Sequence, residues 1–127
     1  MYLLDTSVII DALNGKRDRK ALLAELIRKG DMLGCCAVNV TEVYAGMRPH
    51  EANLTEEFLN SLEYYDITRQ IARQAGLLKR EWARKGKTLS LGDVTIAAVA
   101  TVNKLALATD NVKHYPMQEI EIYQLPE

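Results

Sequence analysis

The chain has 127 residues, of which 48% are hydrophobic and 26% charged, and its formal net charge is −1. This length and composition indicate one globular domain over residues 1–127. A net charge so close to zero excludes a protein that attracts nucleic acid through its overall charge, so any such binding would need a local basic patch.

Strand-like and helix-like segments alternate along the chain at short spacing. In chain order, we expect a strand over residues 1–5, helices over about 8–13 and 18–30, a strand over 32–38, helices over about 39–48 and 55–62, a long helix over 68–85, a helix over 94–102, and strands over 105–109 and 120–123. Asn39 and Thr55 are the expected N-caps of the two middle helices. This alternation predicts an α/β fold in which a parallel sheet carries helices on both faces.

The long helix over residues 68–85 divides into an apolar and a basic side. Its apolar side consists of Ile71, Ala75, Leu78 and Trp82. Its basic side, the arginine stripe, consists of Arg69, Arg73, Arg80 and Arg84. Together with the basic run at residues 16–20, the stripe could follow a phosphate backbone, and it could equally be a solvated helix face.

The sequence predicts a cytoplasmic protein without a membrane span. Asp5 interrupts the first apolar run and no basic leader precedes it, so no signal peptide is expected. The longest apolar stretch, residues 94–102, is far shorter than the roughly 20 residues of a membrane-spanning helix. Cys35 and Cys36 are adjacent and are the only cysteines, so no framework disulfide is expected and a reducing compartment is favoured.

Polar side chains recur where predicted strands give way to helices. Asp5 ends the first strand, Glu42 stands just inside a helix start, and Asp93 opens the apolar helix near residue 94. Residues 109–111, Thr-Asp-Asn, directly follow the strand ending near Ala108. The carboxyl ends of parallel strands share one edge of the sheet, where ligands bind. Several carboxylates on one edge repel each other unless a cation or shared protons intervene.

Each acidic residue also has a structural explanation. Asp5 and Asp93 could cap helices, and Glu42 completes a capping-box pattern with Asn39. As a set they favour a metal site, because Thr6 and Ser7 are available as caps in place of Asp5. In addition, no lysine or arginine adjoins Asp5 or Asp93 in sequence. Oxygen ligands of this kind suit Mg²⁺ or Mn²⁺, and a metal-activated water is what phosphodiester hydrolysis requires.

Other chemistries have weaker support in the sequence. His50 and His114 lie on expected surface segments without paired ligand spacing, so both are interpreted as solvated. A receiver-type phosphoacceptor is also a small parallel α/β protein with an acidic metal pocket. It would require paired early acids, a central aspartate and a late-strand lysine. Here Asp5 stands alone, Cys35-Cys36 occupies the central position, and Lys104 precedes its strand, which argues against a receiver.

Four blocks of the sequence occur in a distinctive order. They are Leu4-Asp5-Thr6-Ser7-Val8-Ile9, Asn39-x-x-Glu42-Val43-Tyr44-x-Gly46, Asp93, and the stretch LATDNVKHY from Leu107 to Tyr115. In order and spacing, these blocks resemble the PIN domain, and in particular the ribonuclease toxins of the VapBC toxin–antitoxin type. The resemblance covers essentially the whole chain.

The resemblance implies a three-layer α/β/α sandwich with a central, mainly parallel sheet. It implies Mg²⁺- or Mn²⁺-dependent endoribonuclease activity on RNA, homodimerisation, and inhibition by a small antitoxin protein. The toxin would then belong to a type II toxin–antitoxin system. A catalytically weak PIN module that acts through protein interaction is the alternative.

The resemblance also assigns roles to individual residues. Asp5, Glu42 and Asp93 match the three acidic metal ligands of the family, and Thr109 is expected to help position the metal-bound water. The fourth acidic position of the family is Asn111 here, which removes one charge and weakens the case for a second metal. Whether the neighbouring Asp110 replaces the missing acid is left open.

Overall fold

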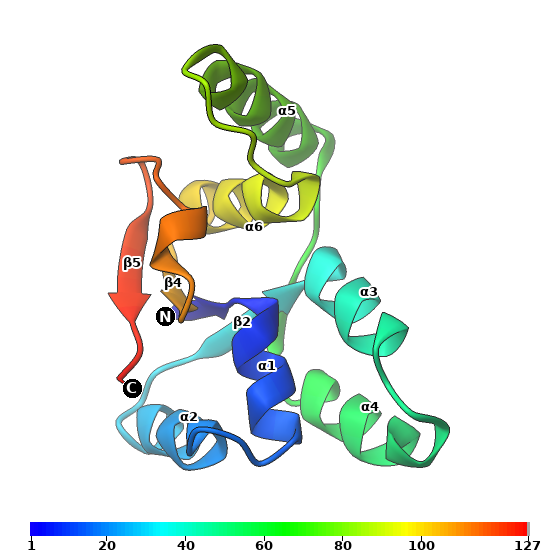
Figure 1. Cartoon of the computed structure of the whole chain (residues 1–127). Helices are drawn as coiled ribbons and strands as arrows, with labels where there is room; N and C mark the ends of the chain where they lie inside the picture. The colour runs from blue at the N-terminus through cyan, green and yellow to red at the C-terminus, as the bar shows by residue number, and fades with distance from the viewer. Residues whose placement is uncertain (127) are drawn as a thin grey trace.

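Five parallel strands form the centre of the fold in the computed structural model, which describes residues 1–126 (Figure 1). Their spatial order is β3-β2-β1-β4-β5, and every neighbouring pair is parallel. The strands are β1 (Tyr2–Leu4), β2 (Leu33–Cys36), β3 (Glu63–Tyr65), β4 (Ala106–Thr109) and β5 (Glu121–Gln124). The prediction of an α/β sandwich around a parallel sheet is confirmed.

Helices cover both faces of this sheet (Figure 1). They are α1 (Thr6–Leu13), α2 (Arg19–Arg28), α3 (Ala37–Ala45), α4 (Ala52–Asn60), α5 (Arg69–Arg84) and α6 (Leu91–Val102). Two short 3₁₀ helices, η1 (Pro49–Glu51) and η2 (Val112–His114), lie in the connections. Within residues 1–126, no helix combines the length and the apolar character needed to cross a lipid bilayer.

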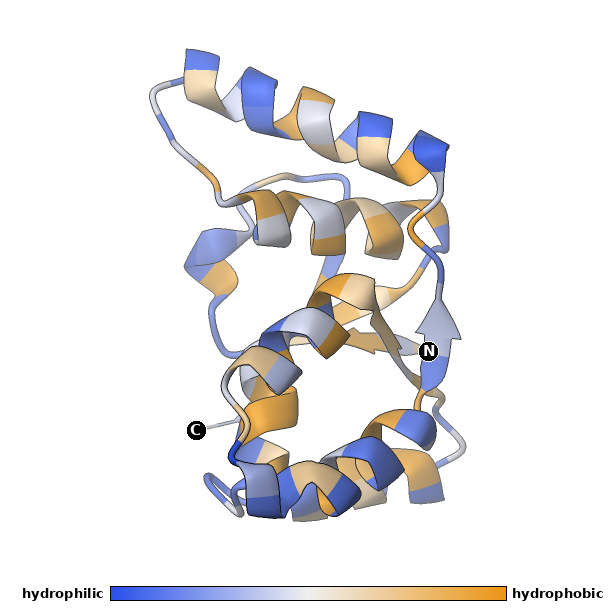
Figure 2. Ribbon diagram, turned by 90° about the vertical axis from the view of Figure 1, so that its right-hand side faces the viewer, coloured by the Kyte–Doolittle hydropathy of each residue, from blue (hydrophilic) through white to orange (hydrophobic). Residues whose placement is uncertain are grey.

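The core has two parts because successive side chains of a strand point to opposite faces of the sheet. Leu3 of β1 belongs to the cluster formed with α5 and α6, whereas Leu4 belongs to the cluster formed with α1 to α4. Helix α6 is apolar on nearly all sides, with Ile96 and Val99 almost fully buried, since it lies between the sheet and α5. Figure 2 shows the contrast between α6 and α5, the uppermost helix, which alternates apolar and hydrophilic residues.

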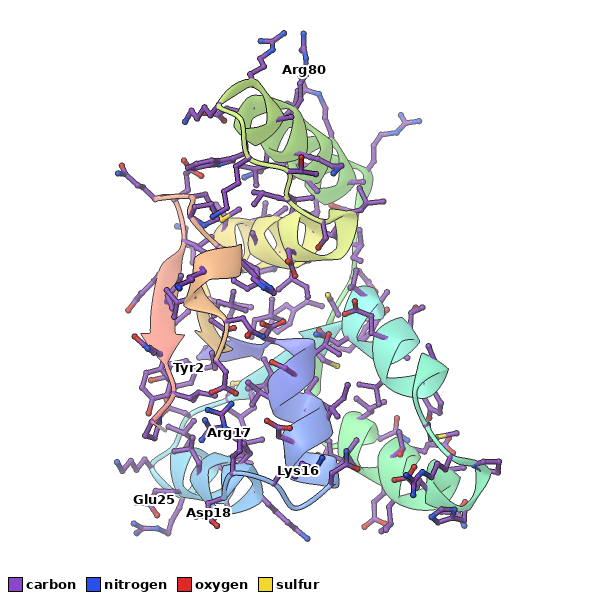
Figure 3. All side chains as sticks on the ribbon, viewed as in Figure 1. Tyr2, Lys16, Arg17, Asp18, Glu25 and Arg80 are labelled. Carbon is purple, nitrogen blue, oxygen red and sulfur yellow. The ribbon has the colours of Figure 1, made fainter. Side chains whose placement is uncertain are left out.

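Helix α5 follows the predicted division. Ile71, Ala75 and Leu78 are buried against α6, and Trp82 is partly buried at the same core. The arginine stripe is exposed, and Arg80 points away from the rest of the molecule (Figure 3). The two sides expected from the sequence are therefore confirmed, while the stripe's function stays a prediction.

The N-caps expected for the two middle helices, Asn39 and Thr55, were wrong. Helix α3 begins at Ala37, and Asn39 occupies its third position, where its Oδ1 accepts a hydrogen bond of 2.8 Å from the Cys36 N–H. Its Nδ2 donates to the Leu4 carbonyl, so Asn39 is a buried link between α3 and β1. Thr55 lies inside α4, which continues directly from η1. Strand β3 was not predicted at all.

The basic run at residues 16–20 is only partly available as a basic surface, because Lys16, Arg17 and Lys20 are exposed but Arg19 is buried. Arg19 is only 2% exposed, and its guanidinium contacts Asp110 at 2.6 Å. Arg17 also approaches Asp110, at 3.4 Å. Arg17 and Asp18 both have φ of 56°, a left-handed conformation that is unfavourable for non-glycine residues. Arg19 is thus engaged in an internal ion pair, to which the exposed Arg17 adds a longer contact.

The adjacent cysteines, Cys35 and Cys36, are both free and buried. Burial raises the pKa of the Cys35 thiol to about 11. The thiol therefore stays protonated near neutral pH, which disfavours a thiolate metal site at this strand.

Candidate metal centre

Asp5 lies at the carboxyl end of β1 and is only 5% exposed. Its Oδ1 accepts hydrogen bonds from the Thr6 N–H at 2.9 Å and from the Tyr115 hydroxyl at 3.0 Å. Its Oδ2 accepts from the Thr109 hydroxyl at 2.6 Å. Asp5 is itself the N-cap of α1, as its structural explanation allowed, so the argument that Thr6 or Ser7 makes Asp5 unnecessary as a cap does not hold. The carboxylate is held rigidly at the edge of the sheet by three donors.

Asp93 lies in the first turn of α6, where Ser90 rather than Asp93 is the N-cap. Its Oδ1 accepts a hydrogen bond from the Tyr115 hydroxyl at 3.2 Å. Its Oδ2 lies 3.4 Å from Nδ1 of His114, which the sequence had placed in solvent without a partner. The Asp93 side chain is 24% exposed, so this side of the site is open to solvent.

Tyr115 connects the two aspartates, which we call the acidic pair. Its phenol oxygen is hydrogen-bonded to both carboxylates, and the residue is only 2% exposed. Burial and the two negative charges raise the pKa of Tyr115 far above its usual value, so the hydroxyl remains a donor. The sequence analysis included Tyr115 in the last block that carries the family resemblance but gave it no role, because the contacts of its hydroxyl with Asp5 and Asp93 join residues far apart in the chain.

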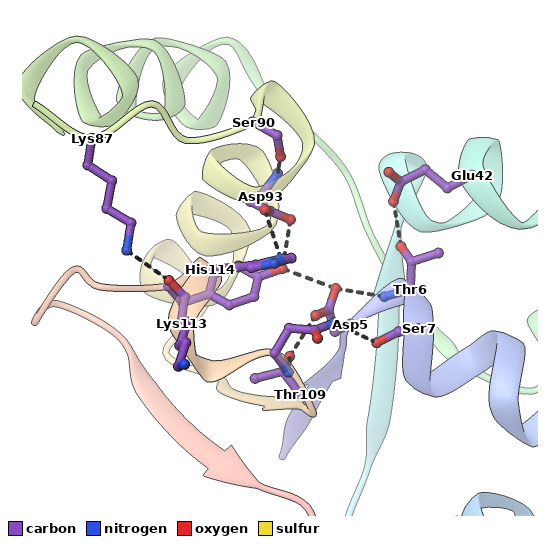
Figure 4. A network of polar contacts seen from close by, with 12 residues as sticks. Asp5, Thr6, Ser7, Glu42, Lys87, Ser90, Asp93, Thr109, Lys113 and His114 are labelled. Carbon is purple, nitrogen blue, oxygen red and sulfur yellow. Dashed lines mark hydrogen bonds and ion pairs between the residues drawn. The ribbon is translucent and has the colours of Figure 1, made fainter. Parts of the chain in front are cut away.

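Glu42 approaches the same region from α3 (Figure 4). Its Oε1 accepts a 2.6 Å hydrogen bond from the Thr6 hydroxyl, which in turn accepts from the Asn39 amide at 3.0 Å. A Cβ added at Gly92 would lie 3.4 Å from the Glu42 Oε2, so this carboxylate borders the first turn of α6, next to Asp93. Three elements thus direct carboxylates toward one edge of the sheet.

The turn after β4 separates the three polar residues predicted there. Thr109 is fully buried and bonded to Asp5, and its hydroxyl also accepts from the Asn111 N–H at 2.9 Å. The Asn111 amide donates to the Ser7 hydroxyl at 3.3 Å. Asp110 instead makes its ion pairs with Arg17 and Arg19. At the end of β4, Thr109 and Asn111 therefore point toward the start of α1. Asp110 points the other way, toward Arg17 and Arg19.

Comparison with known proteins identifies the fold family. The family model of the PIN domain matches residues 2–118. The chain belongs to the PIN-domain family. Among curated relatives of this PIN domain, "Ribonuclease VapC19" of Mycobacterium tuberculosis is 35% identical over 92% of this chain and 94% of the relative. "Ribonuclease VapC10" of the same species is 38% identical over 94% of this chain and 89% of the relative.

Solved structures agree with this assignment. The crystal structure of VapBC2 from Rickettsia felis, bound to a DNA fragment from its promoter, matches the PIN domain with a TM-score of 0.86 and 22% identity over 98% of both chains. A toxin–antitoxin complex from Klebsiella pneumoniae matches with a TM-score of 0.75 and 25% identity, over 96% of this chain and 100% of that one. At these identities the likeness supports the fold.

The donor set of this PIN domain suits a hard divalent cation. Within residues 1–126, no group of three or more His, Cys, Asp or Glu side chains is close enough to enclose a metal ion. Mg²⁺, however, is usually held by one or two carboxylates and keeps several waters. Two carboxylate oxygens that contact the same phenol oxygen, with one side open to solvent, fit such an open site. Glu42 then lies at its margin.

Proposed function

We propose that this PIN domain is a metal-dependent endoribonuclease, the toxin of a type II toxin–antitoxin system. The observation that carries the proposal is the acidic pair held on one phenol at the carboxyl edge of the sheet, in a chain whose curated relatives are named ribonucleases. Asp5 and Asp93 would hold Mg²⁺ or Mn²⁺, with Glu42 completing the acidic cluster. The substrate is RNA, and the proposal places the protein in the cytoplasm.

The protein's own residues orient this site. Thr109 fixes one oxygen of Asp5, and the Thr6 N–H fixes the other. Thr6 also holds Glu42 through its hydroxyl. A bound divalent cation supplies Lewis acidity and lowers the pKa of a coordinated water. The chain thereby presents its carboxylates in fixed positions before any substrate arrives.

The two residues after β4, Asp110 and Asn111, indicate how many metal ions the site binds. Asn111 is neutral and directed to Ser7, while the charge of Asp110 is compensated by Arg17 and Arg19. We therefore propose that Asp110 does not replace the acid missing at Asn111, and that the site works with a single metal ion. Asn111 would instead orient the start of α1 through Ser7, and Thr109 would position the water nucleophile indirectly, through Asp5.

Cleavage of RNA by the purified protein tests the proposed reaction. We expect single-stranded RNA to be cut in the presence of Mg²⁺ or Mn²⁺, to remain intact with excess chelator, and to be cut again when the metal is restored. Electrophoresis of end-labelled RNA would show internal cuts, as an endonuclease requires. Intact RNA at micromolar protein with either metal would instead favour the alternative, a catalytically weak module that acts through protein interaction.

An antitoxin partner is part of the proposal. An apolar groove between α1, α3 and α4 is lined in part by Ile10, Leu13, Val43 and Met47. We propose that a segment of the antitoxin occupies this groove; the toxin–antitoxin complexes among the structural relatives support the existence of such a partner. Co-expression with the adjacent small gene should yield a complex that does not cleave RNA. Failure to co-purify, or cleavage by the complex, would leave only a stand-alone nuclease.

We also propose that the protein is a homodimer. Large apolar side chains are exposed on several helices, including Leu91 at 65% and Tyr44 at 37%. Exposed apolar area of this kind is typical of an interface. Light scattering after size-exclusion chromatography should give twice the monomer mass of 14.3 kDa. A monomer at high micromolar concentration would contradict the proposal.

The arginine stripe is expected to contribute to RNA affinity rather than to the reaction. Changing Arg69, Arg73 and Arg80 together to glutamine should weaken RNA binding by a catalytically inactive variant and flatten its salt dependence. The reason is that each lost phosphate contact releases roughly one counterion fewer. Fluorescence anisotropy over a range of salt concentrations measures both quantities.

A second triple variant controls for the loss of positive charge. Lys29, Arg48 and Lys104 are exposed and lie outside α5. Changing these three to glutamine should leave the slope of affinity against salt closer to the wild-type value. Equal slopes in the two triple variants would mean that the stripe is only a solvated helix face.

A further inference from the structure

The hydroxyl of Tyr115 occupies the space between the two carboxylates of the acidic pair. It lies 3.0 Å from the Asp5 Oδ1 and 3.2 Å from the Asp93 Oδ1. A phenol carries one hydrogen, which it can donate to only one acceptor at a time. Both oxygens therefore share a single proton donor, and within residues 1–126 neither aspartate forms an ion pair with a lysine or an arginine.

The Asp5 carboxylate has little remaining capacity to accept a ligand. Its Oδ1 already accepts from the Thr6 N–H as well as from Tyr115, and its Oδ2 accepts from the buried Thr109. The contact with Thr6 belongs to the cap of α1, and the contact with Thr109 ties β1 to β4. Of the three donors, only Tyr115 lies between Asp5 and Asp93, where a cation attracted to both would be stabilised most.

We propose that the Tyr115 hydroxyl is an internal substitute for the cation, which holds the acidic pair together in the metal-free protein and is displaced from at least one carboxylate when a metal binds. Tyr115 is thus a positioning residue that weakens metal affinity. The inference rests on the proposed metal-binding role of Asp5 and Asp93. It predicts that metal binding and the phenol contacts compete.

Changing Tyr115 to phenylalanine tests this competition. Removing the hydroxyl raises the free energy of the metal-free protein, because the two carboxylates lose their shared donor, and affects the metal-bound protein less. We expect the dissociation constant for Mn²⁺, measured by isothermal titration calorimetry, to fall roughly fivefold, which corresponds to about 1 kcal/mol. The Tm of the metal-free variant should fall by about 4 °C, and added Mn²⁺ should raise it by more than in the wild type.

Tyr123→Phe is the matched control. Tyr123 lies on β5 and packs against Tyr2 of β1, with ring centroids 5.0 Å apart. It is partly buried against the other core cluster. Loss of its hydroxyl should leave the Mn²⁺ affinity unchanged. A purely structural role of Tyr115 would lower the Tm without tightening Mn²⁺ binding.

A second background keeps the inference testable if metal-free Tyr115→Phe does not fold. In Asp93→Asn, one of the two charges is absent, so the hydroxyl has less repulsion to relieve. The loss of Tm from Tyr115→Phe should then be smaller than in the wild type. If Tyr115→Phe alone does not fold but Asp93→Asn with Tyr115→Phe does, this would be the extreme form of the same result. Equal losses in the two backgrounds would overturn the inference.

The outcomes also separate this inference from the proposed function. If the wild type binds Mn²⁺ and Tyr115→Phe binds it with equal or lower affinity, the substitute role is wrong and the metal site stands. If the wild type itself binds no Mn²⁺, the proposed metal-dependent function fails, and this inference fails with it.

Discussion

Replacing Arg19 with methionine should lower the free energy of unfolding by about 3–5 kcal/mol, because it leaves a buried carboxylate without its partner. Arg19 is 2% exposed and its side chain contacts Asp110 at 2.6 Å, while the Asp110 side chain is only 7% exposed. The Arg19 guanidinium also donates to the carbonyl oxygens of Arg17 and Pro126. Urea denaturation followed by circular dichroism measures the loss.

Two further variants distinguish a buried ion pair from a general effect of charge. Arg17 is 44% exposed and lies 3.4 Å from Asp110, so Arg17→Met should cost less than about 1 kcal/mol. In the double variant Arg19→Met with Asp110→Leu, no buried charge remains unpaired, since Arg17 is exposed to solvent, and most of the stability should return. A loss below 1 kcal/mol in Arg19→Met, or no recovery in the double variant, would contradict this account.

Replacing Asp93 with asparagine should reduce RNA cleavage by roughly a thousandfold, since several kcal/mol of metal-derived stabilisation of the transition state are lost. The fold should be retained or slightly stabilised, because the change removes one of two neighbouring negative charges. Cleavage rates and the Tm of the metal-free protein are the two measurements. Asp66→Asn, at an exposed position between β3 and α5, should change neither.

Asp5→Asn should differ from Asp93→Asn in stability although both lose activity. Asp5 accepts hydrogen bonds from three donors on its two oxygens, and an asparagine amide provides only one oxygen. The amide nitrogen would then face a donor in a buried site, so the Tm should fall. Full cleavage by Asp93→Asn, or equal Tm values for the two variants, would argue against the roles given to these residues.

Burial determines the composition of most of the elements that could be predicted from the sequence. β1 and β4 are central strands, and the apolar α6 lies between the sheet and α5, so all three appear as apolar runs. β3 is an edge strand in which Glu63 and Tyr64 are exposed, and its sequence therefore lacks the apolar pattern of a strand. The position of β3 is determined by its pairing with β2, which is distant in sequence, and the local sequence pattern does not predict it.

The same distinction applies to the candidate site. The positions of Asp5, Glu42 and Asp93 at one edge follow from strand topology, which the sequence predicts. The contacts of Tyr115 and the pairing of Asp110 with Arg19 join residues far apart in the chain, and nothing in the local sequence indicates them. The prediction that Asn39 is an N-cap was wrong for a similar reason. Its side chain accepts from the Cys36 N–H at the start of its own helix and also donates to the Leu4 carbonyl, which is distant in sequence.

The position of β1 between β2 and β4 has a consequence for synthesis on the ribosome. β1 pairs with β2 on one side, but on the other side Leu3 pairs with Leu107, and Asp5 is held by Thr109 and Tyr115, so these contacts need residues about a hundred positions later in the chain. During translation the N-terminal residues emerge long before those partners exist. A nascent chain that does not yet include Tyr115 therefore lacks the shared hydrogen-bond donor of the acidic pair, and the proposed site cannot assemble before that residue is synthesised.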